Sequence, residues 1–145
     1  MTEILFYHLE RAALEDVLPG LLEKTRERGW KALVRASSDE RAASLDSHLW
    51  TFREESFLPH GLDRDPHPAE QPILLTAKEQ NANAAEVLFF VDGTAAEDWS
   101  GAEVAAAARV VLIFDGRDPA ALEAAREHWK QAKAGGHEVT YWQQA

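Results

Sequence analysis

The sequence lacks cysteine altogether, and this absence limits its chemistry. Disulfide bonds, thiolate metal sites and cysteine nucleophiles are excluded, and a reducing cytoplasm is compatible with the composition. The chain also lacks an apolar run of about 18 residues, the length that a membrane-spanning helix needs. Its first residues have neither the basic start nor the long apolar run of a signal peptide. We therefore expect a cytoplasmic protein that does not enter a membrane.

Glycine is present at 8 positions but forms no phosphate-binding motif, neither G-x-x-x-x-G-K-[ST] nor G-x-G-x-x-G. An α/β sheet that binds a nucleotide often does so at the turn after its first strand. Here that turn is 9–12, which has no glycine and carries Glu10. Its backbone cannot approach a phosphate closely, and the Glu10 carboxylate would repel one. These residues argue against nucleotide binding.

Positive charge is scarce, with 15 Lys and Arg against 25 Asp and Glu and a formal net charge of -10. Wrapping nucleic acid directly requires a basic surface. Any association with DNA is therefore expected to be indirect, through another protein.

One segment departs from this acidic balance. At about 100° of rotation per residue, four positions of a helix predicted at 118–134 share one face. They are Arg126, Trp129, Lys130 and Lys133. Three cations around an indole suit an acidic peptide with an apolar anchor. The alternative is a solvated helix face whose tryptophan is partly buried. On another side of the helix, Ala121, Ala125 and Ala132 are small enough to pack against a sheet.

The remaining pattern predicts one α/β domain over residues 1–145, with 46% hydrophobic and 28% charged residues, which are globular values. Apolar runs predict strands at 4–9, 31–36, 72–76, 86–91, 109–114 and 138–142, with a polar turn through Asn81 and Asn83 joining the third and fourth. Helical patterns lie at 14–29, 37–50, 102–108 and 118–134. The alternation indicates three layers, a largely parallel sheet with helices on both faces.

Two helix starts can be predicted in more detail. Pro19 fits best in the first turn of the first helix, with Asp16 as a candidate cap, and otherwise marks a kink. Ser37 and Glu40 have the spacing of a capping box at the start of the second helix. The inner stripe of that helix is predicted to be Ala42, Leu45, Leu49 and Trp50.

The proline-rich segment 53–72 holds side chains of the types that bind metals or act as bases, namely His60, Asp63, Asp65 and His67. Their spacing matches no known metal-site pattern, so a solvated loop is expected. No G-x-S-x-G motif is present either. The sequence predicts no catalytic site, no metal and no cofactor. A small α/β enzyme or nucleotide binder that uses His60 and Asp63 is the alternative.

Two segments in this part of the chain carry a family resemblance. Residues 45–50 read L-D-S-H-L-W, and residues 57–62 read F-L-P-H-G-L. They are similar to the L-D-x-x-L-W and F-[LV]-P-H-x-L segments of the chi subunit of bacterial DNA polymerase III. Residues 125–130, A-R-E-H-W-K, resemble the family's A-R-x-R-[WY]-K. The resemblance covers nearly the whole chain, in the right order.

This resemblance implies a non-catalytic subunit with a fold like that of nucleotide-binding proteins but without the phosphate loop. It implies two partners, the psi subunit of the clamp loader and the acidic, Phe-ending C-terminal tail of the single-stranded-DNA-binding protein. The tail-site positions are Arg126, Trp129, Lys130 and Lys133. Arg126 or Lys130 would hold the terminal carboxylate, Trp129 would wall the phenyl ring, and Lys133 would attract upstream aspartates.

The chain departs from the family pattern at Ala132, where many members have Tyr, and at Phe89 and Phe90, where a more polar pair is common. The signature residues Trp50, Phe57, Pro59 and His60 have two interpretations. They form a surface that docks psi, or Trp50 and Phe57 belong to the core and hold the loop on the sheet. A monomer or a 1:1 heterodimer is expected.

Overall fold

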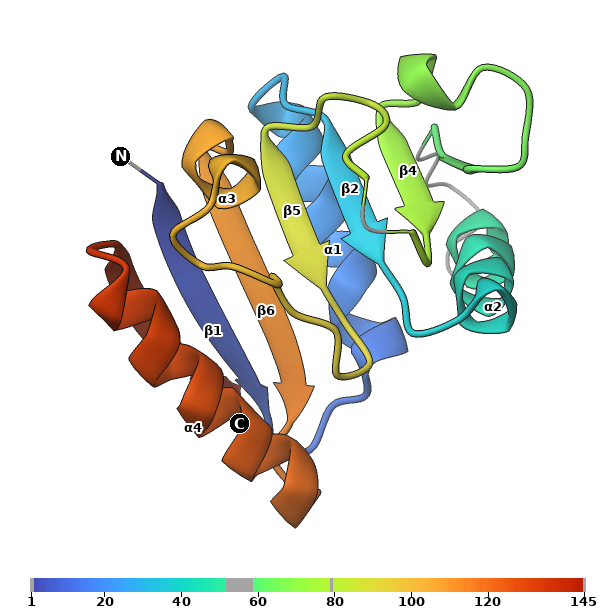
Figure 1. Cartoon of the computed structure of the whole chain (residues 1–145). Coiled ribbons are helices and arrows are strands. Elements are labelled where there is room, and N and C mark those ends of the chain that lie inside the picture. The colour runs from blue at the N-terminus through green and yellow to red at the C-terminus, as the bar shows by residue number, and fades with distance from the viewer. Residues whose placement is uncertain (1, 52–58, 79, 145) are drawn as a thin grey trace.

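The computed structural model describes residues 2–51, 59–78 and 80–144. Strands and helices alternate along most of the chain (Figure 1). The elements are β1 (Glu3–Leu9), α1 (Leu14–Glu27), β2 (Ala32–Arg35), α2 (Asp39–Thr51), β3 (Gly61–Leu62), the 3-10 turn η1 (Pro68–Glu70), β4 (Ile73–Thr76), β5 (Val87–Phe90), α3 (Ala102–Ala106), β6 (Arg109–Asp115), α4 (Pro119–Ala134) and β7 (Glu138–Gln144).

The strands form one seven-stranded sheet with the order β3-β4-β2-β5-β6-β1-β7, and every pairing among the described strands is parallel. Helices α1 and α2 pack on one face, and α3 and α4 pack on the other (Figure 1). This arrangement confirms the predicted α/β class with helices on both faces. The two-residue strand β3 is additional, because its length gives no recognisable apolar run.

Strand alternation divides the core in two. In β1, Phe6 packs toward α3 and α4, whereas Tyr7 packs toward α1 and α2. Successive side chains of a strand point to opposite faces, so each central strand supplies both cores. Nearly continuous apolar runs are the pattern of a parallel sheet that is covered on both sides. None of the helices in the described ranges is long and apolar enough to cross a membrane.

The polar turn predicted between the third and fourth apolar runs is a crossover, because β4 and β5 are not neighbours but lie on either side of β2. Asn83 is buried at the start of β2. Its Nδ2 atom donates to the carbonyl oxygens of Ala32 at 3.1 Å and Gln71 at 3.0 Å. One amide therefore ties the crossover to the amino ends of β2 and β4.

Helix α1 begins earlier than its proline suggested. Pro19 lies in the second turn, and Asp16 is the third helical residue, whose carboxylate accepts from the Ala13 N–H at 3.1 Å. A proline has no N–H to offer the carbonyl four residues earlier, here that of Glu15. The Nε2 atom of His48 in α2 lies 2.7 Å from this oxygen. A carbonyl only accepts, so His48 donates and replaces the missing helical hydrogen bond.

Helix α2 is capped by Ser38 rather than by the predicted Ser37. The Oγ atom of Ser38 accepts from the Arg41 N–H at 3.1 Å. The inner stripe is Ala42, Leu45 and Leu49, all buried. Trp50 was predicted to join this stripe, and that prediction is wrong, because its side chain is 52% exposed.

Candidate functional site

Helix α4 is fixed at both ends by residues that the sequence places there. The Asp118 carboxylate accepts from the Ala120 N–H at 3.0 Å, and Pro119 occupies the first turn. Gly136 has a φ of 84°, a left-handed conformation that glycine adopts without strain, just after the helix ends. Ala125 and Ala132 are buried against the sheet, which lets the helix axis come close to β1 and β6.

Trp129 stands between the core and the surface. Its half-buried indole packs edge-to-face on Phe6 with 5.5 Å between ring centroids, and on Tyr141 with 6.1 Å. The Nζ atom of Lys133 lies 5.2 Å from the centroid of the same ring. Trp129 therefore packs on the core and also leaves one side accessible.

A cleft of about 470 Å³ opens between α4 and the sheet beside Trp129. Strands β1, β6 and β7 supply its floor, and α4 supplies one wall. Its lining is mostly apolar and consists of Phe6, His8, Phe114, Leu122, Ala125, Arg126, Trp129, Lys130 and Tyr141. The fold thus brings together Arg126, Trp129 and Lys130, three of the four predicted positions. Lys133 does not line the cleft, and Ala132 lies in the core beneath it.

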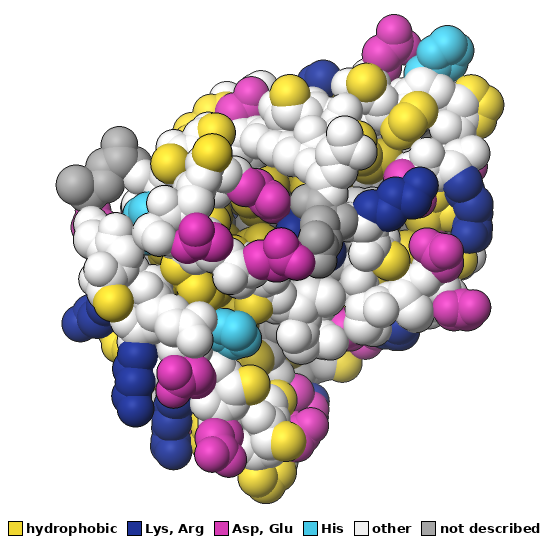
Figure 2. Space-filling model, in the orientation of Figure 1, with side chains coloured by type: hydrophobic (Ala, Val, Ile, Leu, Met, Phe, Trp, Pro, Cys, Tyr) yellow, Lys and Arg dark blue, Asp and Glu magenta, His cyan; other side chains and the backbone are white. Residues whose placement is uncertain are grey.

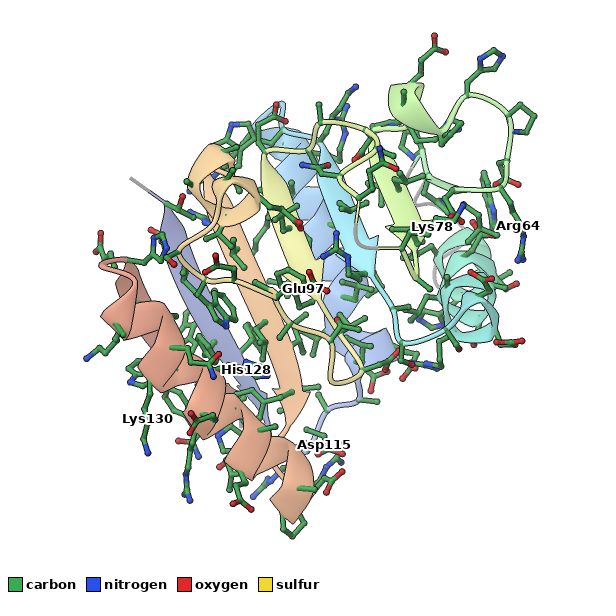
Figure 3. All side chains as sticks on the ribbon, viewed as in Figure 1. Arg64, Lys78, Glu97, Asp115, His128 and Lys130 are labelled. Atoms are coloured by element: carbon green, nitrogen blue, oxygen red, sulfur yellow. The ribbon has the colours of Figure 1, made fainter. Side chains whose placement is uncertain are left out.

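The two cations of the cleft, Arg126 and Lys130, are available to a ligand. Arg126 and Lys130 are both exposed, and neither forms an ion pair with an acidic side chain of the described residues. Figure 2 shows Lys and Arg side chains projecting together from the side where α4 lies, and Lys130 points away from the body of the molecule in Figure 3. They can therefore bind an anionic group from outside without first breaking an internal pair.

The floor of the cleft depends on a close approach between β1 and the turn after β6. The His8 ring lies 5.0 Å from that of Phe114, and its Nδ1 is hydrogen-bonded to the Tyr141 hydroxyl. A Cβ atom on Gly116 would overlap the His8 imidazole, so any larger residue there requires the ring to move. Burial, and then the charge of Glu10, raise the pKa of Tyr141, which keeps its hydroxyl protonated.

Six lining residues were not predicted as site residues from the sequence, namely Phe6, His8, Phe114, Leu122, Ala125 and Tyr141. Pairing aligns Phe6 with Tyr141 across β1 and β7, and His8 with Phe114 across β1 and β6. Alternate positions near the carboxyl ends of the three strands were a usable signal. This pattern identifies the lining residues only when β1 is known to lie between β6 and β7.

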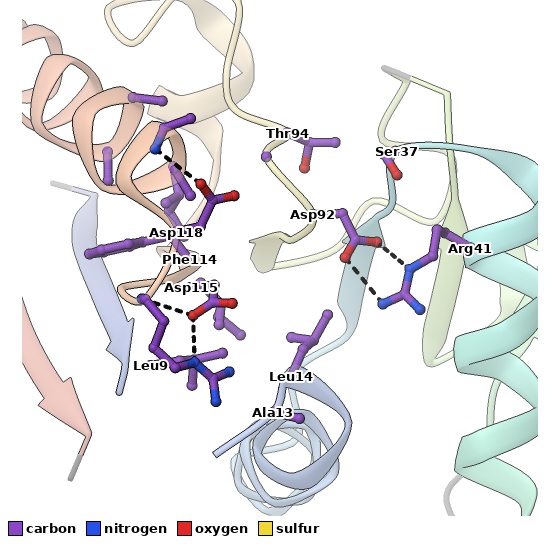
Figure 4. Close-up of a pocket in the computed structure, with 18 of the residues that line it drawn as sticks. Leu9, Ala13, Leu14, Ser37, Arg41, Asp92, Thr94, Phe114, Asp115 and Asp118 are labelled. Atoms are coloured by element: carbon purple, nitrogen blue, oxygen red, sulfur yellow. Dashed lines mark hydrogen bonds and ion pairs between the residues drawn. The ribbon is translucent and has the colours of Figure 1, made fainter. Parts of the chain in front are cut away.

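A larger cleft of about 670 Å³ lies at the carboxyl ends of the central strands, where sheets of this type bind nucleotides (Figure 4). Arg41 is held there by Asp92 and Glu15, each at 2.9 Å, and its hydrogen bond to Asp92 raises the pKa of the guanidinium. Asp115 and Asp118 add negative charge on the opposite side. The cleft's other guanidinium, that of Arg117, pairs with Asp115 at 2.8 Å. With both arginines paired and carboxylates around them, this cleft does not suit a phosphate.

The segment that suggested an enzyme is occupied by structural contacts. His60 is buried, and its Nε2 atom lies 3.1 Å from the Asp46 carbonyl oxygen and 3.4 Å from the Asp46 carboxylate. Asp63 pairs with Lys78 at 3.2 Å, and the Asp65 carboxylate accepts from the Leu62 N–H at 2.8 Å. Across the described residues, no three His, Asp or Glu side chains converge as metal ligands.

The second set of signature residues separates into two environments. The Trp50 ring lies 4.3 Å from that of His60, with a tilt of 43° between the ring planes, so a buried histidine supports an exposed indole. Pro59 is exposed beside them. Trp50 is therefore a surface residue and His60 a core residue. Phe57, the remaining member of the set, lies outside the described residues.

The protein is thus an α/β protein with a parallel sheet, no phosphate-binding motif in its sequence, and an aromatic cleft bordered by the exposed residues Arg126 and Lys130. Comparison with known proteins agrees. The chain belongs to the DNA polymerase III chi subunit (HolC) family, whose model matches residues 1–140. The chi subunit is a non-catalytic accessory subunit of that polymerase.

Two curated relatives carry the same description. A probable DNA polymerase III subunit chi of Rickettsia prowazekii (strain Madrid E) is 32% identical over 94 residues, which cover 65% of this chain and 57% of the relative. A DNA polymerase III subunit chi of Pseudomonas aeruginosa is 32% identical over 91 residues, 61% of this chain and 63% of the relative. The chain thus spans about three fifths of the length of these relatives. The resemblance in the sequence motifs is confirmed.

Proposed function

We propose that this protein is a replication adaptor of the DNA polymerase III holoenzyme. In this proposal the cleft beside Trp129 binds the acidic, Phe-ending C-terminal tail of the single-stranded-DNA-binding protein, and a second surface joins the clamp loader through psi. Membership of the chi family supports the assignment to the holoenzyme. The observation that carries the tail site is that free Arg126 and Lys130 border a cleft with aromatic walls.

The chemistry of the cleft matches both parts of such a tail. Trp129 and Tyr141 offer aromatic surface to a terminal phenyl ring, and edge-to-face or offset packing is favoured there. Arg126 or Lys130 holds the terminal carboxylate, because a charge-assisted hydrogen bond is stronger than a neutral one. A volume of about 470 Å³ lies within the usual range of roughly 300–1,000 Å³ for small binding pockets. Because both cations are exposed, binding weakens as salt rises.

Lys133 has a different part in the same proposal. It does not line the cleft but lies over the Trp129 ring. From there its charge attracts upstream acidic residues of the tail. Its cation–π contact also stabilises the position of the Trp129 indole, by roughly 0.5–1 kcal/mol at exposed sites. It therefore contributes less to the grip on the terminal carboxylate than Arg126 does.

The psi-docking surface is proposed around Trp50 and Pro59. Trp50 is one of three large hydrophobic side chains that are exposed in the described residues. Tryptophan is among the commonest energetic anchors of protein interfaces. His60 supports its ring from the core. A Trp50→Ala variant should fold normally and lose psi from a co-purified complex.

A peptide-binding experiment tests the tail site. An acidic peptide that ends in Phe should bind the protein at low salt. The same peptide with a C-terminal carboxamide, or with Ala in place of Phe, should bind much more weakly. Arg126→Ala and Trp129→Ala should weaken binding, while Lys24→Ala, an exposed helical cation on α1, serves as the matched control. Equal binding of the carboxylate and carboxamide peptides, or equal effects of Arg126→Ala and Lys24→Ala, would contradict the proposed site.

A further inference from the structure

The two edges of the sheet differ in length and in protection. At one edge, β3 has two residues, which are both buried. At the other edge, β7 has seven residues and pairs only with β1 within the described ranges. Tyr141 and Trp142, two of the three exposed large hydrophobic side chains of the described residues, are consecutive in β7 and are 43% and 57% exposed.

Strand β7 has little of what normally protects an edge, because its one charged residue is Glu138 at the first position. Its sequence, EVTYWQQ, contains no proline and no lysine. Native sheets usually guard their edges with such residues, with bulges or with a covering segment, since unpaired N–H and C=O groups are a template for another strand. A long edge that pairs with no described strand, and that carries two exposed aromatic rings, therefore indicates a partner strand.

We infer that the free edge of β7 pairs with an extended acidic segment, the part of the bound tail that leads into the cleft. This inference rests on the proposed function. Tyr141 connects the two surfaces, because it lines the cleft and lies on the edge strand. A peptide that leaves the cleft past Tyr141 meets the edge of β7 that pairs with no described strand. There, main-chain hydrogen bonds bind it regardless of its side chains.

The charges near β7 favour an acidic segment over a second copy of the chain as the occupant of this edge. A chain of formal net charge -10 repels its own copy, whereas Arg126, Lys130 and Lys133 of α4 lie beside the cleft that opens at β7. Those cations form no ion pair with the acidic residues that the structure describes. They attract a segment rich in Asp or Glu.

The alternation of β7 sets a side-chain pattern for the added segment. Tyr141 faces α4 and the cleft, and its ring contacts Trp129. Trp142 faces the other side and packs edge-to-face on Tyr7 at 6.0 Å. Side chains of a paired strand alternate in the same way. Positions on the α4 face would therefore be acidic, and a position opposite Trp142 would favour an apolar side chain.

Two peptides of different length separate this inference from the proposed function. A short peptide of about four residues reaches the cleft alone, and a long peptide of about ten residues also spans the edge strand at roughly 3.3 Å per residue. The long peptide should bind roughly tenfold more tightly.

Hydrogen exchange should show slowed exchange of the β7 amides with the long peptide only. N-methylation of alternate upstream peptide nitrogens should reduce its affinity to that of the short peptide, and Trp142→Ala should weaken only the long peptide, with Trp50→Ala as the control.

Each outcome decides the matter. If both peptides bind equally and β7 amides exchange at unchanged rates, the edge inference is overturned and the cleft remains. If neither peptide binds, the proposed function fails and the inference fails with it. If β7 amides are protected without peptide and sedimentation shows a dimer, the occupant is a second copy, which also overturns the inference.

Discussion

The ammonium group of Lys133 lies 5.2 Å from the centre of the Trp129 ring, outside the cleft that Arg126 and Lys130 line. One helix face therefore carries cations with two different relations to a bound peptide. Arg126 and Lys130 can touch the ligand directly, while Lys133 acts through Trp129 and through its charge.

Lys133→Met should reduce the affinity for an acidic, Phe-ending peptide less than Arg126→Met does. The difference between wild type and Lys133→Met should shrink as salt is added, because an exposed charge that acts at a distance is screened. Calorimetric titration at two ionic strengths measures both effects. A larger loss for Lys133→Met than for Arg126→Met would place the carboxylate at Lys133 instead.

Gly116→Ala should destabilise the protein by about 1–3 kcal/mol, the usual cost of overpacking. The new methyl group would collide with the His8 imidazole, which packs on Phe114 and is hydrogen-bonded to Tyr141. The collision should also break the hydrogen bond between His8 and Tyr141 and weaken peptide binding. In a His8→Ala background the same change should be nearly neutral in urea unfolding. An unchanged penalty in that background would mean that the collision is with another group.

His48→Ala should cost about 1–3 kcal/mol, since it leaves the Glu15 carbonyl without its donor. Pro19→Ala restores an N–H that can reach the same carbonyl within α1. His48→Ala should therefore cost less in the Pro19→Ala background than in the wild type. A double-mutant cycle by urea unfolding measures the difference. Additive effects would show that His48 does not compensate for the proline.

Stability should fall in mild acid partly through His128. Burial lowers the pKa of this imidazole below its ordinary value of 6.5, and its Nδ1 accepts from the Trp99 indole N–H at 3.4 Å. The unfolded chain then binds the proton more readily than the folded one. This contribution to stability is complete above pH 6.5 and is lost as pH falls through the lower, folded pKa.

His128→Gln keeps an acceptor but cannot titrate. The variant should lose less stability than the wild type between about pH 7.5 and about pH 5.5 in urea unfolding. Equal losses in the two proteins would assign the acid sensitivity to other groups.

The elements were predictable because their signals are local. Long apolar runs mark six of the seven strands, and the spacing of Arg126, Trp129 and Lys130 places them on one face of α4 without reference to the rest of the chain. Trp50 was misplaced for a local reason as well. Leu45 and Leu49 lie one above the other on the inner stripe, and the next residue is rotated by about 100° toward solvent.

The strand order and half of the cleft were not predictable, because they depend on distant contacts. The described residues of the crossover from β4 to β5 form no helix, and no sequence pattern in them indicates that the chain passes β2. Phe6, His8, Phe114 and Tyr141 come together only because β1 lies between β6 and β7. The sequence specified the helix wall of the site, and the sheet topology supplied its floor.

The central claim is that the cleft beside Trp129 binds an acidic, Phe-ending tail. The most direct test is a titration of isotope-labelled protein with such a peptide, following the indole N–H signals of its 5 tryptophans by NMR. The signal of Trp129 should shift in proportion to binding, while those of Trp30 and Trp50 stay in place. A titration that moves Trp50 and leaves Trp129 unchanged would contradict the account.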